Sequence, residues 1–301
     1  MPGNEPTICI FQGDCRSILA VLPPNSVNCV VTSPPYFGLR DYGVAGQIGL
    51  EASLDAYVAE LVAVFREVRR VLRPDGTLWL NLGDSYTSGG RSTRAHDDKS
   101  RAREMAFRAD TAAGLKPKDL MMVPHRVAIA LQADGWWVRQ DIVWHKPNPM
   151  PESVTDRCTK AHEYLFLLTK SERYFFDAEA IREEQVKGAA GSEFHTGKTG
   201  EHQLGRASRA ERVDGAAPGR NKRSVWTIAP KPFKEAHFAT FPPALVEPCI
   251  LAGCPVGGVV LDPFSGAGTT ALVAKRLGRS AIGIELNPDY VEMSRLRIAR
   301  G

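Results

Sequence analysis

The chain has 301 residues, which is enough for one large α/β domain with a small inserted module. Its composition, 43% hydrophobic and 24% charged, is that of a soluble globular protein, and no apolar run reaches the roughly 20 residues of a membrane span. Six cysteines without a Cys-x-x-Cys pair argue against a zinc ribbon or another metal site and favour reduced core thiols in a cytoplasmic protein. Residues 1–6 contain neither a basic patch nor an apolar core, so we expect no signal peptide.

The first half of the chain alternates between strand-like and helix-like patterns. Apolar residues between Leu54 and Leu72 recur at helical spacing, and Ser53 precedes them as an N-cap. A Pro-Asp-Gly turn then separates this helix from the next apolar run. In chain order, the patterns predict strands at residues 7–11 and 27–32, a helix at 54–72, a turn at 74–76, a strand at 77–82 and a helix at 118–133.

The second half continues the alternation after one strand pair. The strands at 137–145 and 164–169 have no long helix between them, so we expect them to form a hairpin. Asn287 and Pro288 mark the cap and first turn of the last helix. The remaining elements are a strand at 259–262, a helix at 269–277, a strand at 280–285 and a helix at 288–297. Seven strands joined by crossover helices predict an α/β fold with a doubly wound, mostly parallel sheet.

Two polar segments interrupt this pattern, at residues 85–117 and 184–222. Both are longer than ordinary connections, so they are either functional loops or a small inserted domain. Residues 86–118 hold eight Lys and Arg against four Asp and Glu, and residues 198–234 hold nine against three. Two basic segments on a chain of net charge +4 suggest a polyanion as partner, although each alone would also suit a solvated loop.

A glycine-rich loop joins an apolar strand to the helix that follows it. Gly266 and Gly268 allow the backbone to bend tightly and to approach a ligand closely. Seventeen residues after Gly268, Glu285 ends the next strand, where an acidic side chain can hold both hydroxyls of a ribose. Enzymes that bind NAD share this pattern, but here Ala271 stands in place of the third glycine. The Asp262 carboxylate at the mouth of the loop would repel a pyrophosphate and suits an ammonium group, as in S-adenosylmethionine.

A tetrad, Ser33-Pro34-Pro35-Tyr36, follows the strand at 27–32. Its two prolines hold the backbone extended and rigid. The Ser33 hydroxyl and the Pro34 carbonyl suit the two N–H groups of an aromatic amine, whose lone pair is otherwise delocalised into its ring. Tyr36 suits stacking on a base flipped out of a duplex. Taken alone, the tetrad would equally fit a strand that ends in a proline turn, with Tyr36 as a packing residue.

Residues 32–36 and 262–270 together resemble the catalytic and cofactor motifs of the amino-methyltransferases of bacterial and phage DNA modification, in the β order of that family. The resemblance covers about residues 7–180 and 236–300. It implies the S-adenosylmethionine-dependent methyltransferase fold with permuted motif order, neighbouring chain termini, catalysis by the tetrad and S-adenosyl-L-methionine as cofactor. The cofactor-binding residues implied are Asp14, Cys15, Thr32, Phe241, Asp262, Pro263, Phe264, Ser265, Gly266, Gly268, Thr269, Thr270, Glu285 and Leu286.

The resemblance also implies a DNA-binding side, because residues 144–149 and 162–164 are similar to segments that face the target base. It divides the chain into a catalytic half (1–183, with a mobile basic loop at 85–117), a target-recognition insert (184–235) and a cofactor-binding half (236–301). The candidates for DNA contact are Arg40, Lys146, Arg220, Lys222 and Arg223. Double-stranded DNA is therefore the expected partner.

The first residue of the tetrad bears on the target base. The resemblance implies that Ser33 accompanies methylation of cytosine N4, with adenine N6 as the alternative. Methylation at cytosine C5 needs a cysteine nucleophile, but Cys249 lies in the apolar run 244–251 and is predicted to be helix core. More distant alternatives are an RNA or protein-amide methyltransferase and a non-catalytic nucleic-acid-binding protein. We also expect a cognate restriction endonuclease as a candidate partner and a monomeric or homodimeric state. The expected location is the cytoplasm of a bacterial or phage-infected cell.

Overall fold

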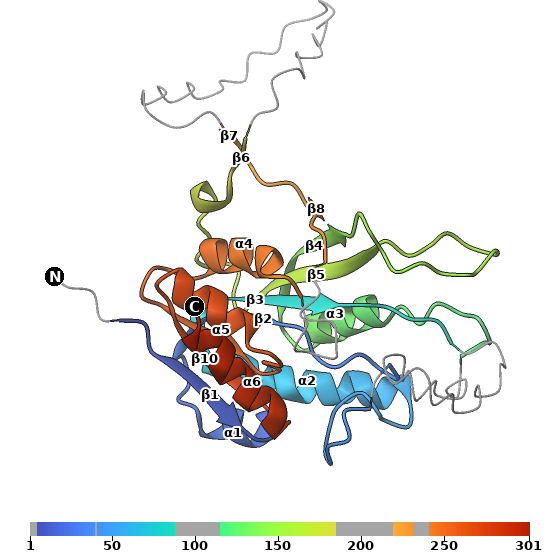
Figure 1. Cartoon of the computed structure of the whole chain (residues 1–301), viewed down its shortest axis with the longest axis horizontal. Coiled ribbons are helices and arrows are strands. Elements are labelled where there is room, and N and C mark those ends of the chain that lie inside the picture. The colour runs from blue at the N-terminus through green and yellow to red at the C-terminus, as the bar shows by residue number, and fades with distance from the viewer. Residues whose placement is uncertain (1–4, 40, 88–114, 185–218, 231–240) are drawn as a thin grey trace, which may run out of the picture.

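A computed structural model of the chain describes residues 5–39, 41–87, 115–184, 219–230 and 241–301. Its centre is one eight-stranded sheet, ordered β1-β10-β9-β2-β3-β5-β4-β8 (Figure 1). The strands of this sheet are β1 (Ile8–Gln12), β2 (Val27–Thr32), β3 (Leu72–Leu82), β4 (Trp137–His145), β5 (His162–Thr169), β8 (Val225–Thr227), β9 (Val259–Asp262) and β10 (Ser280–Glu285). The shorter β6 (Glu183–Glu184) and β7 (Gly219–Arg220) form a separate antiparallel pair.

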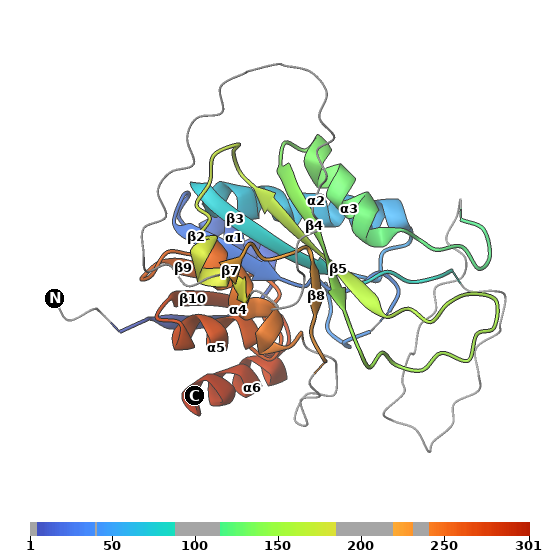
Figure 2. The same cartoon turned by 90° about the horizontal axis from the view of Figure 1, so that it is seen from above.

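Helices cover both faces of the sheet, which gives the three layers seen from above in Figure 2. The helices are α1 (Cys15–Val21), α2 (Leu54–Val71), α3 (Val123–Ala133), α4 (Pro243–Gly253), α5 (Thr269–Arg276) and α6 (Pro288–Ala299), with one 3₁₀ turn, η2 (Glu179–Ile181). Helices α1, α2 and α3 lie on one face and α4, α5 and α6 on the other. No helix in the described part of the chain is long and apolar enough to cross a membrane.

Each face has its own hydrophobic core, as the sequence pattern requires. Helix α2 is capped by the Ser53 side chain, and buries Tyr57, Leu61 and Phe65 on the face that the helical spacing predicted. On the opposite face, Cys249 of α4 is fully buried with Trp79 of β3. The prediction that Cys249 is a core residue is therefore confirmed, and burial raises the pKa of its thiol well above the ordinary value.

Four neighbouring strands, β1, β10, β9 and β2, run parallel to one another, so their carboxyl ends meet at one edge of the sheet. The predicted functional segments follow these strands at that edge. The antiparallel pair of β4 and β5, predicted as a hairpin, brings His145 and His162 to the same edge beside the end of β3. Since ligands of open α/β sheets bind outside the carboxyl ends of parallel strands, the topology predicts the site here.

The first and last segments of the chain are neighbours, as the permuted order implied. Strand β1 pairs with β10 along its whole length, from Ile8 opposite Ala281 to Gln12 opposite Glu285. A guanidinium nitrogen of Arg295 on α6 also donates to the Ile10 carbonyl, at 3.1 Å.

Three details of the fold differ from the sequence prediction. The Pro-Asp-Gly segment does not separate α2 from a new strand, because β3 already pairs with β2 at Leu72 and bulges before Thr77. Helix α3 begins only at Val123, since Met122 before it has a left-handed backbone (φ 56°) that ends the preceding loop. The sheet also gains an eighth strand, β8, which pairs with β4 although it falls inside the expected insert 184–235.

Other predictions fall largely outside the described residues. These are the greater part of the basic loop 85–117 (residues 88–114), most of the insert (residues 185–218 and 231–235) and the DNA-contact candidate Arg40. The two ends of the basic loop are joined, since Thr87 N donates to the Asp119 carbonyl at 2.9 Å and Met121 N donates to the Ser85 carbonyl at 3.0 Å.

Candidate active site

One cavity of about 640 Å³ opens at the carboxyl edge of the sheet, a volume typical of small-molecule sites. Segments from both ends of the chain line this single cavity. The predicted residues on its wall are Asp14, Cys15, Ser33, Pro34, Pro35, Tyr36, Lys146, Phe241, Pro263, Phe264, Ser265, Gly266, Thr269, Glu285 and Leu286. The tetrad and the glycine-rich loop, about 230 residues apart in the sequence, therefore share one space.

Glu285 is fixed at the end of β10 by the glycine-rich loop. Its Oε2 accepts a hydrogen bond from Gly266 N at 2.7 Å, and its Oε1 accepts one from Asn287 N at 2.9 Å. Burial raises the pKa of this carboxyl. Each oxygen keeps a lone pair for a further donor, so the side chain suits a ligand that carries two hydroxyls.

The glycine-rich loop borders open space and contains a buried hydroxyl without a hydrogen-bond partner among the described residues. Gly266 has φ of +50°, and a Cβ placed on it would meet nothing within 4 Å, so the backbone borders open space. The Ser265 hydroxyl is buried and is without a hydrogen-bond partner among the described residues. A buried polar atom without a partner costs about 1–3 kcal/mol, so Ser265 also fits a site for a polar ligand.

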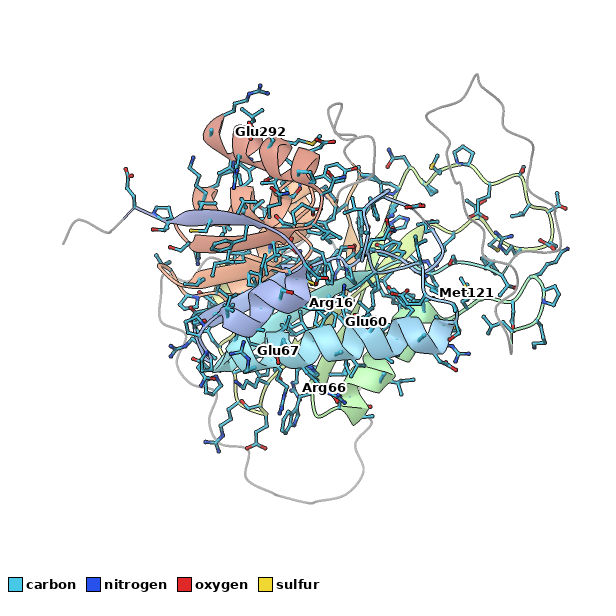
Figure 3. All side chains as sticks on the ribbon, turned by 90° about the horizontal axis from the view of Figure 1, so that it is seen from below. Arg16, Glu60, Arg66, Glu67, Met121 and Glu292 are labelled. Carbon is cyan, nitrogen blue, oxygen red and sulfur yellow. The ribbon has the colours of Figure 1, made fainter. Side chains whose placement is uncertain are left out.

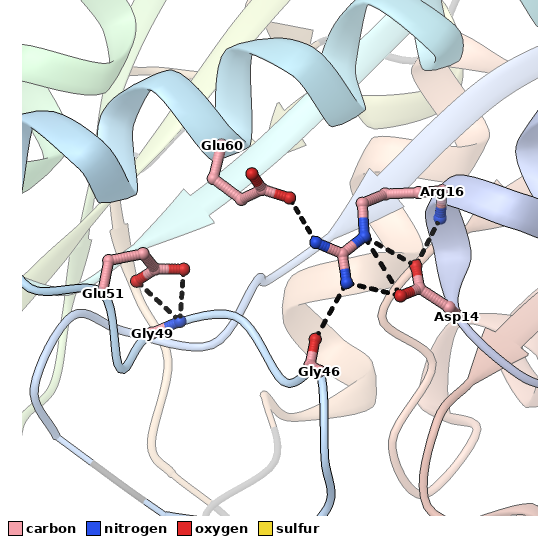
Figure 4. A network of polar contacts seen from close by, with 6 residues as sticks. All are labelled: Asp14, Arg16, Gly46, Gly49, Glu51 and Glu60. Carbon is pink, nitrogen blue, oxygen red and sulfur yellow. Dashed lines mark hydrogen bonds and ion pairs between the residues drawn. The ribbon is translucent and has the colours of Figure 1, made fainter.

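Asp14 lines the cavity, but its carboxylate is already engaged (Figure 4). It caps α1 by accepting from Arg16 N at 2.8 Å, and it forms an ion pair with the Arg16 guanidinium, which lowers its pKa. Arg16 also pairs with Glu60 Oε1 at 2.5 Å and so joins α1 to α2 (Figures 3 and 4). Next to it, burial raises the pKa of Cys15 to about 12, which excludes a reactive thiolate there.

Four of the predicted cofactor residues lie behind the cavity wall: Thr32, Asp262, Gly268 and Thr270. The Asp262 side chain accepts from Thr32 Oγ1 at 2.6 Å, from Thr270 Oγ1 at 2.8 Å and from Phe264 N at 3.1 Å. The residue is only 2% exposed. The ammonium-binding role predicted for Asp262 does not fit this placement, because the carboxylate is turned into the core. It instead fixes the end of β2, immediately before the tetrad, to the start of the loop.

The buried carboxylate of Asp262 predicts a pH-dependent stability. Burial raises its pKa to about 6 from 3.8, so the folded protein binds this proton more tightly than the unfolded chain does. The stabilisation is complete below pH 3.8 and is lost as the pH rises through 6. Between about pH 5 and about pH 8, this group is expected to lower the free energy of unfolding of the wild type by about 1 kcal/mol. Asp262→Asn has a similar shape but no titrating proton, so this part of the decrease should be absent. Urea unfolding of both proteins at the two pH values measures this difference, and identical pH profiles would contradict the assignment.

Gly268 serves helix packing rather than ligand approach. Its φ is +73°, and an added Cβ would lie 2.8 Å from Cβ of Ser294 on α6. Gly268→Ala is therefore expected to lower the free energy of unfolding by about 2–4 kcal/mol through strain and overpacking. Chemical unfolding measures this loss. Gly257→Ala is the matched control, because Gly257 also has a positive φ (+74°) but has open space around it, so backbone strain acts there alone.

The tetrad occupies the opposite wall of the cavity. The Pro35 carbonyl accepts from the Tyr57 hydroxyl at 2.8 Å, which holds the proline pair onto α2. Among the described residues, none donates a hydrogen bond to the carbonyl of Pro34. The Tyr36 ring lies directly on Gly83, where a Cβ would come within 2.5 Å of it. Any side chain at position 83 would displace Tyr36.

Two polar residues of this wall were not in the predicted site. Asn81 and Glu163 both face the Tyr36 hydroxyl, with oxygens at 3.3 Å and 2.9 Å. Asn81 is an isolated polar residue in the apolar run of β3, and this feature of the sequence could have indicated a functional role. Glu163 belongs to the segment expected to face the base, but nothing local indicated its partner.

Lys146, a predicted DNA-contact residue, lines the cavity and is engaged within the fold, and its contact to DNA stays a prediction. Its ammonium group pairs with Glu163, and it lies 4.3 Å from the centroid of the Trp144 ring. Only 20% of its side chain is exposed. The pairing of β4 with β5 brings Lys146 and Glu163 together at the cavity.

Three further DNA-contact candidates gather around Glu183 near the β6–β7 pair. Nitrogens of Arg220, Lys222 and Arg223 lie 3.2, 3.9 and 3.1 Å from its carboxylate. Lys222 also lies over the ring of Trp226. Of the three, Arg223 has the most exposed side chain, at 65%. The cluster thus stabilises the base of this segment, and Arg223 is the member that is most available to a partner.

Comparisons with known proteins agree with this geometry. A family model described as DNA methylase matches residues 27–296. The Type II methyltransferase M.Cfr9I of Citrobacter freundii is 52% identical over 95% of this chain and 85% of its own. The solved structure of TTHA0409 from Thermus thermophilus, complexed with S-adenosyl-L-methionine, has 26% identity, covers 98% of this chain and 94% of its own, and superposes with a TM-score of 0.61. The PvuII DNA methyltransferase (cytosine-N4-specific), at 21% identity, 98% and 89% coverage and a TM-score of 0.65, shares the fold.

Proposed function

The chain belongs to the DNA methylase family, and we propose that it transfers a methyl group to cytosine N4 in duplex DNA, with the target base held at the tetrad. The observation that carries this proposal is the single cavity, in which Ser33 and Pro34 face the same space as Ser265 and Glu285. A flipped base and its methyl donor must meet in such a space.

The cofactor is S-adenosyl-L-methionine, which supplies a methyl group activated by its sulfonium. Glu285, with both oxygens oriented by backbone N–H groups, would hold the ribose hydroxyls. The Ser265 hydroxyl, which has no partner among the described residues, would form a hydrogen bond with a polar group of the cofactor beside the open space at Gly266. Phe241 and Phe264 supply apolar wall, so the residues present fit the group.

The tetrad residues would act on the target amine. Its two N–H groups donate to Ser33 Oγ and to the Pro34 carbonyl, which draws the nitrogen toward tetrahedral geometry and frees its lone pair. The two prolines hold the Pro34 carbonyl in place, and the Ser33 hydroxyl contacts Tyr36 Oη at 3.4 Å, so both acceptors are positioned before the base binds. The Tyr36 ring, fixed against Gly83, offers a flat surface on which the flipped base stacks.

The neutral Ser33 hydroxyl favours cytosine N4 over adenine N6 as the target. A carboxylate or amide would be the stronger acceptor, and the resemblance associates those side chains with adenine. Duplex DNA is the proposed partner, and the role of residues 184–235 in target recognition stays a prediction. A cognate endonuclease and a bacterial cytoplasmic location are proposed with it, by analogy with Type II methyltransferases.

Identification of the modified nucleoside tests the proposal directly. The protein is incubated with unmethylated plasmid DNA and S-adenosylmethionine carrying a labelled methyl group. The DNA is then digested and its nucleosides are separated by mass. Labelled N4-methylcytosine is the expected product, whereas N6-methyladenine would replace the base assignment. Label in RNA or protein, with none in DNA, would overturn the proposal. Direct sequencing of the modified plasmid then maps the target site.

A further inference from the structure

The Tyr36 hydroxyl lies at the centre of a small polar group in the cavity wall. Its neighbours are Glu163 Oε2 at 2.9 Å, Asn81 Oδ1 at 3.3 Å and Ser33 Oγ at 3.4 Å. The orientation of the Asn81 amide is fixed, because its Nδ2 donates to the Tyr164 carbonyl at 3.1 Å. Two of the three neighbours therefore present only acceptors to Tyr36.

This arrangement determines where the hydroxyl protons point. Tyr36 has one proton, and it must donate this proton to Glu163 or Asn81, since neither of them has a donor to offer in return. Its oxygen is then left with lone pairs only. Ser33 is the one neighbour of this oxygen among the described residues that can donate to it. The Ser33 proton therefore turns toward Tyr36, and the lone pairs of Ser33 Oγ remain for the cavity.

Lys146 stabilises this arrangement from the other side of Glu163. Its ammonium group forms an ion pair with Oε1, while Tyr36 donates to Oε2. The Glu163 side chain is 17% exposed, so water competes little for the carboxylate. Burial and the charge of Glu163 also raise the pKa of Tyr36 well above its ordinary value, which keeps the proton on the tyrosine.

We propose that Glu163 is a positioning residue that acts through Tyr36 and makes Ser33 a pure hydrogen-bond acceptor toward the target base. This inference deepens the proposed function and rests on it. A base with an amine at the target position donates to Ser33 and to the Pro34 carbonyl. A base with a carbonyl there, such as uracil in place of cytosine, would bring a third acceptor against these two. The wall thus discriminates cytosine from its deamination product.

Binding without cofactor measures this discrimination apart from catalysis. Two duplex oligonucleotides carry the mapped site with either cytosine or uracil at the target position. In both, the target lies opposite an abasic site, so that the two bases are equally unpaired. The wild-type enzyme is expected to bind the cytosine duplex at least tenfold more tightly. Because Lys146 faces the other atom of this group, Glu163→Gln turns an amide N–H toward the Tyr36 oxygen, where it competes with the more distant Ser33 hydroxyl (2.9 Å against 3.4 Å). The Ser33 proton is then free to turn toward the base, so most of this preference should be lost.

A double-mutant cycle separates positioning from a merely structural role. Tyr36→Phe is expected to lose the same preference as Glu163→Gln, and the double variant should lose no more than either. Glu67→Gln is the matched control, because Glu67 also forms an ion pair, with Arg70, but lies outside the cavity, and it should keep the full preference. Equal weakening of both duplexes by Glu163→Gln, or additive losses in the double variant, would overturn the inference.

The nucleoside assay of the wild-type enzyme distinguishes this failure from a failure of the proposed function. If the product is N6-methyladenine, adenine and hypoxanthine replace cytosine and uracil in the two duplexes, and Glu163→Gln is expected to lose the preference for adenine. If no base is methylated, the proposed function fails and the inference fails with it. If cytosine is methylated and Glu163→Gln keeps its preference, only the inference fails.

Discussion

Replacing Ser33 by alanine is expected to reduce the single-turnover methylation rate about 10²–10³-fold, the typical cost of removing one preorganised polar group from an active site. The affinity for S-adenosylmethionine should change less than about threefold, because Ser33 is placed on the wall opposite Glu285 and acts on the amine. Single-turnover methylation and equilibrium binding of the cofactor measure the two quantities. The expected result is thus a loss of rate without a loss of cofactor binding.

The matched control for this substitution is Ser26→Ala. The Ser26 hydroxyl donates to the Pro23 carbonyl at 2.7 Å and lies outside the cavity. The Ser26→Ala enzyme should therefore methylate DNA at the wild-type rate. A Ser33→Ala enzyme that methylates as fast as this control would remove Ser33 from the chemistry, and the Pro34 carbonyl would remain as the principal acceptor of the amine.

The sequence was sufficient for the strands and helices that bury apolar residues with a clear period. Strand β2, helix α2 and strand β9 lie where their apolar patterns placed them, because burial of those residues is what forms the elements. Strand β8 was missed for the opposite reason. Only Trp226 of its three residues is buried, so it has no apolar period. Its pairing with β4 joins segments that are distant in the sequence, which a local pattern cannot predict.

The candidate site was predictable as far as it depends on strand ends. The tetrad and Ser265 follow parallel strands and Glu285 ends one, so the topology brings them to one edge. Whether a side chain at a strand end points into the cavity or into the core was not predictable. Asp262 follows the same rule but turns inward, because two threonine hydroxyls and a backbone N–H satisfy it there.

Charged residues were the least predictable, because their roles depend on partners that are distant in the sequence. Lys146 was predicted only as a DNA-contact candidate, and its ion pair with Glu163, 17 residues later, was not. Arg220 and Arg223 likewise meet Glu183 across 37 and 40 residues. A basic segment therefore indicates a polyanion only after the charges that pair within the fold have been subtracted.

Replacing Glu285 by alanine is expected to weaken binding of S-adenosylmethionine about 100-fold, measured by calorimetric titration without DNA. Hydrogen bonds to a charged group contribute about 1.5–3 kcal/mol each, and Glu285 is placed to accept two. Its carboxylate is held in advance by Gly266 N and Asn287 N, so little entropy is lost when a ligand binds. The effect should appear in affinity and leave the rate of the saturated enzyme less altered.

The control for this last variant is Glu292→Ala, an exposed glutamate on α6 (Figure 3), whose loss should leave the affinity unchanged. Because Glu285→Ala also leaves two backbone N–H groups without their partner, the thermal midpoint of each protein is measured in parallel. A folded Glu285→Ala protein that binds the cofactor within threefold of the wild type would contradict the ribose assignment. The cofactor would then have to be held by Ser265 and the apolar wall alone, and Ser265→Ala would become the variant with the larger effect.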